Sequence, residues 1–450
     1  MKKAFRVMSA GIAAGLLVAG LAGCTSGGSA NSGYVYFLNF KPEVANQYQA
    51  ILDEYKQETG VTVKIQTAAS NTYEQTLTSE MAKSQPPTIF QINGPVGYAN
   101  WKDYTADLTN SDIYQHLTDQ SLAVKTDQGV WGVPYVVEGY GIIYNDAIMK
   151  KYFALSDKSA AVTATSADQI KDWATLKAVV EDMTAHKAEL GIAGVFSNTS
   201  LKPGEDWRWQ THLANVPLFY EFNQDKLDLT QGTPATIKFT YGDNMKNLFD
   251  LYLNNSTVAA TELGSKTVDD SMAEFALGQS AMVQNGNWGW SQIDQVQGNT
   301  VQAGDVHMLP LYMGIPGEDN YGIPIGTENY FAINSKVDAA SQQASLDFLT
   351  WLFSSEYGKN AVSNSLGFIA PFDWFTAADA PNDPLAQEVM KWMSSGTQSV
   401  SWSPFQVMPS QDWKNSFGGD LLRYAQGQID WPTVESSMVS DWATQAAQAQ

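Results

Sequence analysis

The chain has 450 residues, 44% of them hydrophobic, which allows two or three domain-sized units with buried cores and excludes a fibrous or compositionally disordered protein. Its 26 basic and 47 acidic residues give a formal net charge of −21 at pH 7. Nucleic acid is therefore excluded as an expected partner, because phosphate backbones are bound through Lys and Arg.

The N-terminus indicates export and anchoring. A basic start precedes an apolar run, residues 10–21, which has the length of a signal-peptide core and is too short for a stable transmembrane helix. It leads into Leu-Ala-Gly-Cys, which resembles the lipobox of bacterial lipoproteins and contains the only cysteine of the chain, Cys24. We expect a lipoprotein signal peptide over residues 1–23, lipidation of Cys24, and a flexible Ser/Gly-rich tether over residues 24–33.

These features predict where the protein works. A lipidated cysteine implies an extracytoplasmic protein held at the cell membrane of a bacterium through its lipid anchor only. The acidic mature chain and the sparse cysteine favour a Gram-positive surface. With a single cysteine, the chain can form no internal disulfide.

The mature chain opens with alternating strands and helices. Residues 34–40, 61–66 and 88–92 have strand character, and the apolar residues between them recur at helical spacing. This β-α-β-α-β order predicts a mostly parallel sheet covered by helices. Ligands of such sheets bind beyond the carboxyl ends of the strands, where Asn39 and Asn93 stand.

The rest of the chain mixes strands and helices without an internal repeat. Further strands are expected over residues 129–145, 194–198, 280–284, 306–311 and 329–334, and helices over 172–190, 206–213, 241–253, 268–277, 339–353, 384–393 and from 420 onward. The segment NGNWGW, residues 285–290, is expected to form a loop after its strand.

Motifs for the common catalytic and cofactor chemistries are absent from the sequence. There is no phosphate-binding loop, dinucleotide fingerprint, nucleophile elbow or H-E-x-x-H motif, and the four histidines are far apart. We therefore expect no enzyme, no metal and no cofactor. An acid–base pair of carboxylates stays open, because Asp and Glu are plentiful.

Aromatic residues beside amides and carboxylates indicate a sugar site. The chain has 14 Trp and 20 Tyr, many of them next to Asn, Gln, Asp or Glu after predicted strands. An indole ring can cover the apolar face of a sugar, while amides and carboxylates bind its hydroxyl rim. The alternative is that these rings are core residues, which aromatic side chains commonly are.

Four stretches follow in order behind the lipobox: FLNFKPEVANQYQAILDEYKQETGVTVKI, PPTIFQINGPVGYANW, VPYVVEGYGIIYN and FALGQSAMVQNGNWGWSQI. Together they resemble the carbohydrate-binding lipoproteins of bacterial ABC importers, extracellular solute-binding protein family 1, which includes maltose-binding proteins. The resemblance covers nearly the whole mature chain. It implies a periplasmic-binding-protein-like type II α/β fold, in which two α/β lobes surround a central ligand cleft with hinge crossovers.

The resemblance also implies the division of the chain into lobes that close on a ligand by hinge motion. Crossings are expected near residues 140–144, 326–330 and 362–368. The expected N-terminal lobe comprises residues 34–142 plus 329–364, and the C-terminal lobe residues 143–328 plus 365–450.

The resemblance further implies a ligand site. Trp288 matches the stacking tryptophan of the family, with Asn285 and Asn287 as hydroxyl partners. The other expected contacts are Asn39, Glu43, Asn93, Glu138, Tyr140, Trp207, Arg208, Trp209, Glu328, Asn329 and Trp413. The loops depart from the maltose-specific pattern, so the resemblance does not imply maltose as the ligand.

The implied function is capture of a neutral sugar by a monomer, which delivers it to the permease subunits of an ABC importer. The aromatic count favours an oligosaccharide over a monosaccharide. One alternative is an extracellular glycoside hydrolase, although the sequence lacks the eight regular β-α units of a barrel hydrolase. Another is a binder of the same fold for a polyamine, a peptide or a glycerol derivative.

Overall fold

The computed structural model describes residues 33–69 and 72–448. The predicted signal peptide, Cys24 and all but the last residue of the predicted tether lie outside the described residues. No helix within the described ranges is long and apolar enough to cross a membrane.

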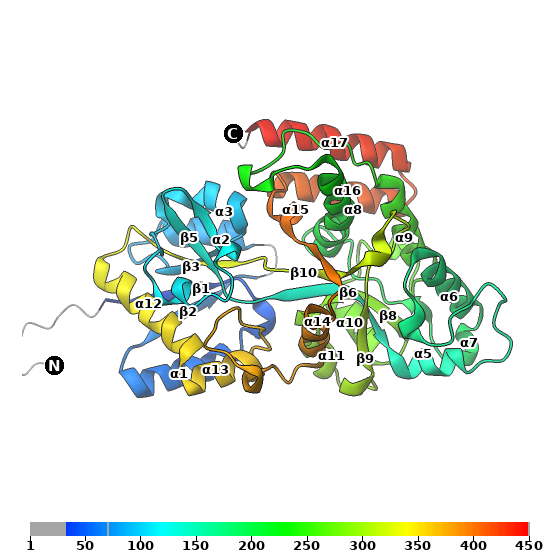
Figure 1. The fold of residues 1–450 in the computed structure, drawn as a ribbon, viewed down its shortest axis with the longest axis horizontal. Coiled ribbons are helices and arrows are strands. Elements are labelled where there is room, and N and C mark those ends of the chain that lie inside the picture. Colours follow the sequence, from blue (N-terminus) through cyan, green and yellow to red (C-terminus); the bar gives the residue numbers. More distant parts are fainter. Residues whose placement is uncertain (1–32, 70–71, 449–450) are drawn as a thin grey trace, which may run out of the picture. The chain divides into compact units, whose positions relative to one another are not determined.

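The first sheet is built mainly from the N-terminal part of the chain (Figure 1). Its strands, in spatial order, are β2 (Val63–Thr67), β1 (Val35–Asn39), β3 (Ile89–Ile92), β11 (Tyr330–Ile333), β5 (Gly129–Pro134) and β4 (Val124–Thr126). As the β-α-β-α-β pattern predicts, β1 is parallel to both β2 and β3. The later strands β11, β5 and β4 join antiparallel.

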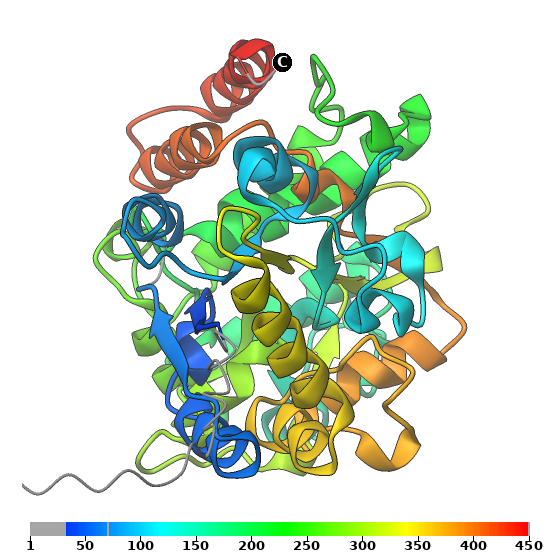
Figure 2. The same ribbon diagram turned by 90° about the vertical axis from the view of Figure 1, so that its left-hand side faces the viewer.

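Helices cover both faces of this sheet. One face packs on α1 (Tyr48–Thr59), α4 (Asp112–Gln115), α12 (Ala339–Ser354) and α13 (Glu356–Asn360), and the other on α2 (Tyr73–Met81) and α3 (Gly94–Trp101). Figure 2 shows α12 in front, with α1 in blue near its lower end. Phe37 points into the first of these cores and Leu38 into the second, which explains why β1 is apolar at consecutive positions.

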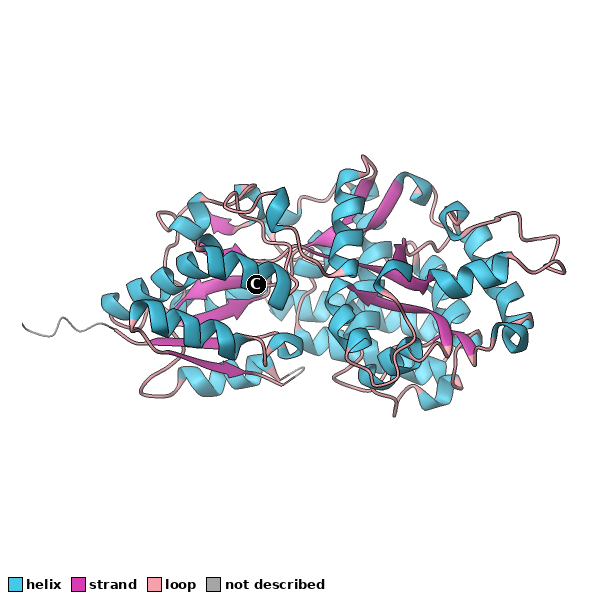
Figure 3. Ribbon diagram, turned by 90° about the horizontal axis from the view of Figure 1, so that it is seen from below, coloured by secondary structure: helices cyan, strands magenta, loops and turns pink. Residues whose placement is uncertain are grey.

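The second sheet has the order β12 (Gln398–Ser401), β10 (Tyr321–Gly326), β6 (Glu138–Asn145), β8 (Ser280–Gly286) and β7 (Gly194–Phe196), and β9 (Val306–Leu309) also pairs with β6. Its helices are α5 (Asp146–Phe153), α6 (Trp173–Ala185), α7 (Lys187–Leu190), α8 (Ala214–Asp225), α9 (Gly242–Asn254), α10 (Val268–Ala276), α11 (Trp290–Asp294), α14 (Pro384–Ser394), α15 (Ser403–Gln406), α16 (Gln411–Ala425) and α17 (Trp431–Gln448). Figure 3 shows the strands of both sheets enclosed by helices.

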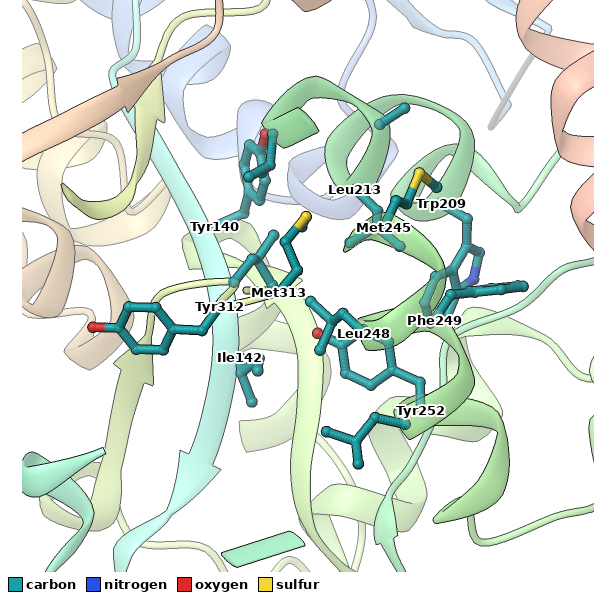
Figure 4. Close-up of a cluster of buried hydrophobic side chains, with 14 of the residues drawn as sticks. Tyr140, Ile142, Trp209, Leu213, Met245, Leu248, Phe249, Tyr252, Tyr312 and Met313 are labelled. Carbon is teal, nitrogen blue, oxygen red and sulfur yellow. The ribbon is translucent and has the colours of Figure 1, made fainter. Parts of the chain in front are cut away.

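The largest core lies on one side of this second sheet (Figure 4). There Trp209 packs edge-on against Phe249 and Tyr252, with ring centroids 5.4 Å apart in both pairs. Tyr140 and Ile142 of β6 point into the same core.

Three local features differ from the sequence-based expectation. Strand β8 continues through Asn285 and Gly286, so only the last part of NGNWGW leaves the strand, as the 3-10 turn Asn287–Gly289. Residues Arg208–Leu213 form a π-helix rather than the start of an α-helix. The C-terminal helical region begins at Gln411, nine residues earlier than expected.

The chain passes between the two sheets at three places. It leaves β5 for β6 through residues 135–137 and returns from β10 to β11 through residues 327–329. The expected first crossing at residues 140–144 lies inside β6 instead. The third passage follows Phe372, which is still packed in a core of the first sheet, and precedes α14. It therefore comes later than the expected residues 362–368, and the exact lobe boundaries stay a prediction.

Gly141 of β6 is required by a close approach of the neighbouring strand. A Cβ at Gly141 would lie 2.4 Å from the carbonyl oxygen of Leu309. We expect Gly141→Ala to lower the free energy of unfolding by about 1–3 kcal/mol, because the central strands would have to move apart. Urea unfolding measures the change. Gly304→Ala is the control, since a Cβ there meets nothing within 4 Å, and equal stability of the two variants would contradict the prediction.

Candidate functional site

A cluster of charged and aromatic side chains lies where elements of the two sheets meet. Some of these side chains are buried. The partly exposed ones are Glu43, Trp207, Trp288, Glu328 and Lys414. We call the full set the central cluster: Lys41, Glu43, Glu138, Trp207, Arg208, His212, Asn285, Trp288, Glu328 and Lys414.

A buried ion pair joins the loop after β1 to the first residue of β6. The ammonium of Lys41 lies 2.7 Å from Oε1 of Glu138 and 3.5 Å from Oε1 of Glu43. Asn39 holds this loop, because its side-chain amide donates to the backbone oxygen of Lys41 and its Oδ1 accepts from the backbone nitrogen of the same residue. Burial lowers the pKa of Lys41, but the hydrogen bond to Glu138 and the combined attraction of Glu138, Glu43 and Glu328 outweigh burial and raise the pKa, so the ammonium stays charged.

Two tryptophans form an aromatic wall that one asparagine orients. The ring centroids of Trp207 and Trp288 are 5.8 Å apart. Oδ1 of Asn285, at the end of β8, accepts 2.8 Å hydrogen bonds from Nε of Arg208 and Nε1 of Trp288. The guanidinium of Arg208 in turn lies 3.9 Å from the centre of the Trp207 ring. Burial lowers the pKa of Arg208 to about 9, which leaves it charged at neutral pH.

A second layer of rings supports this wall from beneath. The His212 ring lies 5.2 Å from Trp288, 4.4 Å from Tyr140 and 5.6 Å from Trp402. Burial and the positive charge of Arg208 lower the pKa of His212 well below its usual value, so this ring is neutral. The hydroxyl of Tyr140 donates to the backbone oxygen of His212 and fixes the layer in place.

The passage from β10 to β11 contributes the remaining carboxylate. Burial raises the pKa of Glu328 to about 7, although the charges of Lys41 and Lys414 oppose the rise. Lys414 of α16 lies over the ring of Phe405, 4.7 Å from its centre, and burial lowers the pKa of its ammonium. Gln406 of α15 bonds to the oxygen of Thr327 and to the hydroxyl of Tyr330, and thereby ties the second sheet's helices to the passage.

The structure brings together much of the predicted site. Six predicted contacts belong to the central cluster together with Asn285: Glu43, Glu138, Trp207, Arg208, Trp288 and Glu328. Asn287 is buried behind them, where its Oδ1 accepts from the backbone nitrogen of Gly139. Asn93 is partly exposed at the end of β3, directly before Gly94, which faces Gln406 of the other sheet's helices.

Other predicted contacts lie in the interior. Trp209 is fully buried and donates its indole N–H to the backbone oxygens of Thr199 and Ser200. Trp413 is 1% exposed, and its indole N–H bonds to the oxygen of Met438. The ligand contact expected for both is unsupported, because both rings are buried in the core. Three further residues are also buried, with no more than 1% exposure: Asn39, Tyr140 and Asn329.

Sequence reasoning missed several members of the central cluster. Lys41 stands between the predicted residues Asn39 and Glu43, and Lys414 follows the predicted Trp413 directly. One step along a helix turns a side chain by about 100°, so Trp413 points into the core while Lys414 points toward the cluster. His212 had no local signal beyond its place in the segment of Trp207 and Arg208. No group of three or more His, Cys, Asp or Glu side chains able to hold a metal ion is present in the described ranges.

The raised pKa of Glu328 predicts a pH dependence of stability. Between about pH 4.5, its usual pKa, and about pH 7, its pKa in the folded state, the folded protein binds more protons than the unfolded chain. Stability contributed by this group is therefore present at low pH and lost as the pH rises through this window.

We expect Glu328→Gln to remove this part of the loss, and urea unfolding at several pH values measures it. Glu181→Gln on the exposed face of α6 is the control and should keep the wild-type slope. An unchanged slope in Glu328→Gln would contradict the assignment.

Solved structures of sugar-binding proteins share this fold. A chitin oligosaccharide binding protein superposes with a TM-score of 0.70 at 17% identity, covering 93% of this chain and 100% of its own. A sugar transporter from Bacillus licheniformis in complex with stachyose gives 0.67 at 15% identity, with coverages of 91% and 100%. The maltose/maltodextrin-binding domain MalE from Bdellovibrio bacteriovorus, bound to maltotriose, gives 0.64 at 15%, with 92% and 98%. These likenesses confirm the predicted periplasmic-binding-protein-like two-lobe α/β fold.

Sequence comparison identifies the family. No curated protein sequence matches the chain significantly. The profile of the bacterial extracellular solute-binding proteins, however, matches residues 50–399, which include every strand of the two sheets except β1 and the end of β12, and most of the central cluster. The chain therefore belongs to the bacterial extracellular solute-binding protein family, as the resemblance in its sequence predicts.

Proposed function

We propose that this protein captures a neutral oligosaccharide at the central cluster and delivers it to the permease subunits of an ABC importer. The observation that carries the proposal is the partly exposed pair Trp207 and Trp288, which stands beside both hydrogen-bond donors and acceptors. Indole rings can cover the apolar face of a sugar ring. Arg208 and Lys414 can donate to its hydroxyls, while Glu43 and Glu328 can accept from them.

The names of structurally similar proteins support an oligosaccharide. One of the three proteins is named for binding chitin oligosaccharide, and the other two were solved with stachyose and maltotriose. Each of these ligands has several sugar units. Because identity to these proteins is between 15% and 17%, we propose the class of ligand and no particular sugar.

The fold supports capture between lobes. The central cluster combines residues beside the first sheet, such as Lys41 and Glu43, with residues of the second sheet, such as Asn285. A ligand bound there would contact both lobes and favour their closed arrangement, which the permease would recognise. The hinges would lie at the chain passages, residues 135–137, 327–329 and 373–383.

The sequence of the N-terminus completes the proposal. With Cys24 lipidated, the monomer would act outside the cytoplasm, tethered to the cell membrane of a Gram-positive bacterium, and would need no cofactor, metal or nucleic acid. It would not be an enzyme.

The hydrolase alternative keeps one supporting observation. Burial raises the pKa of Glu328 to about 7, and a second carboxyl group, that of Glu43, belongs to the same cluster. Incubation of the purified protein with oligosaccharides decides the matter, since shorter products would overturn the carrier proposal.

A titration with Trp288→Ala tests the proposed site. Thermal shift and calorimetry with maltotriose, stachyose, raffinose and chitin oligosaccharides identify a bound sugar, because a ligand that binds the folded state raises its stability. For that sugar we expect Trp288→Ala to raise Kd at least about tenfold, equivalent to about 1.4 kcal/mol, through loss of the stacked ring.

The matched control is Trp351→Ala, which removes a partly exposed indole from α12. The N–H of this indole donates to Glu58. It should leave Kd unchanged. Thermal unfolding of Trp288→Ala without ligand separates a lost contact from a lost fold. If no neutral sugar shifts the wild type while a polyamine or peptide does, the proposal is wrong.

A further inference from the structure

A cavity lies at the opposite end of strand β10 from the central cluster. It has a volume of about 940 Å³, and we call it the tyrosine cavity after Tyr220, Tyr241 and Tyr321, which line it. Tyr321 starts β10 and pairs with Gln398 of β12, whereas the strand ends at Gly326, two residues before Glu328. Five residue steps of about 3.3 Å put these ends roughly 16 Å apart, so the two places are separate.

The three tyrosines present partly exposed rings at different orientations. Tyr220 lies edge-to-face with Tyr241 and with Tyr321, with centroids 6.2 Å and 5.5 Å apart. The hydroxyl of Tyr241 donates to Gln224 at 2.6 Å. The hydroxyls of Tyr220 and Tyr321 make no hydrogen bond with any residue that the structure describes, so both remain available to a ligand.

Two buried carboxylates hold the loops that form the walls. Glu318 accepts hydrogen bonds of 2.8–3.2 Å from the backbone nitrogens of Met313, Gly314 and Ile315, and one of 3.2 Å from that of Trp173. It thereby fixes the turn that leads to Tyr321.

Glu221 holds the backbone of the segment that leads to Tyr241, a second part of the lining. It accepts from the backbone nitrogens of Lys238 and Thr240, at 2.7 Å and 2.5 Å, directly before Tyr241. The walls are therefore organised before any ligand binds, which lowers the entropy that binding would cost.

The lining excludes strongly anionic ligands. Among the residues that the structure describes, it includes no Lys, Arg or His, and Asp319 is its single carboxylate. The remaining polar groups are amides and hydroxyls from Gln224, Asn320, Thr397 and Gln398. Ring faces beside uncharged donors and acceptors match a ligand with apolar C–H faces and many hydroxyls.

We propose that the tyrosine cavity is a second binding site for a neutral glycan, separate from the central cluster. It would hold a glycan on the outside of the second sheet, against the rings of Tyr220, Tyr241 and Tyr321. This inference rests on the chemistry of the cavity and stands whether or not the central cluster binds sugar.

Hydrogen exchange with the whole mature chain locates the second site. The probes are maltohexaose, xylohexaose and chitohexaose, each added at increasing concentration to the wild type and to Trp288→Ala. We expect at least one glycan to slow exchange in residues 316–321 and 396–398, in both proteins and at the same concentrations. No protection of these segments by any of the three glycans would overturn the proposal.

Substitution of the ring tests the assignment. Tyr241→Leu retains apolar bulk but removes the ring face and hydroxyl, and we expect it to weaken this protection about tenfold. Tyr357→Leu, the same change at a partly exposed tyrosine beside the first sheet, should leave it unaltered.

Asn320→Ala provides a second test at an exposed rim position, and should also weaken protection, so the result does not depend on Tyr241→Leu folding. Equal protection in Asn320→Ala and the wild type would overturn the proposal. Failure of the proposed function gives a different result. In that case the wild type and Trp288→Ala would bind sugar at the central cluster with the same Kd, whatever happens at the tyrosine cavity.

Discussion

The buried ion pair between Lys41 and Glu138 is the constraint on which the central cluster depends. Removing two charges from water costs several kcal/mol each, and their attraction compensates only when the geometry is good. Here the distance is 2.7 Å and the loop that carries Lys41 is held by the side chain of Asn39. Any arrangement that separates the end of β1 from the start of β6 would leave a buried charge unpaired.

The ion pair lies directly beside the first passage of the chain between the two sheets. Glu138 follows residues 135–137, which lead from the first sheet into the second. The pair therefore fixes the start of β6 relative to β1 at the place where the chain changes sheets. Glu43 lies 3.5 Å from the same ammonium, so this partly exposed carboxylate takes its position from the same buried lysine.

Asn285 does for the aromatic wall what Lys41 does for the carboxylates. One oxygen accepts from both Arg208 and Trp288, and the residue itself is fixed in β8 opposite Gly141. The orientation of the two partly exposed indoles is thus set by a strand rather than by a loop. Sites built on regular elements keep their geometry without a ligand, which favours tight binding.

The sequence was sufficient for the architecture and only partly for the site. Parallel β1, β2 and β3 follow from local periodicity, because strand and helix patterns are properties of neighbouring residues. The end of β8 was placed too early, since the glycines and asparagines of NGNWGW favour a turn while pairing with β6 extends the strand. Trp209 and Trp413 were expected to face a ligand, because a tryptophan in the core and one at a site look alike in sequence.

The missed residues have the same physical origin. Lys414 and His212 join the central cluster through residues far away in the chain, Lys414 through its charge, which acts on Glu328, and His212 through its ring contact with Trp288. Their neighbours Trp413 and Trp209 carried the stronger local signal but point the other way. A π-helix over Arg208–Leu213 adds to the difficulty, since it changes which residues share a face relative to an ordinary helix.

The balance of charge in the central cluster bears on the kind of ligand it favours. Among the described residues, Arg208 and Lys414 have no carboxylate within ion-pair distance. Glu328 likewise has no cationic side chain within that distance. Ionisable groups of both signs without an ion-pair partner among the described residues therefore belong to the same cluster. An anion would satisfy only the cations and repel Glu43, whereas a polyamine would satisfy only the carboxylates. A neutral ring of hydroxyls can accept from the first group and donate to the second at once, while its apolar face covers the indoles.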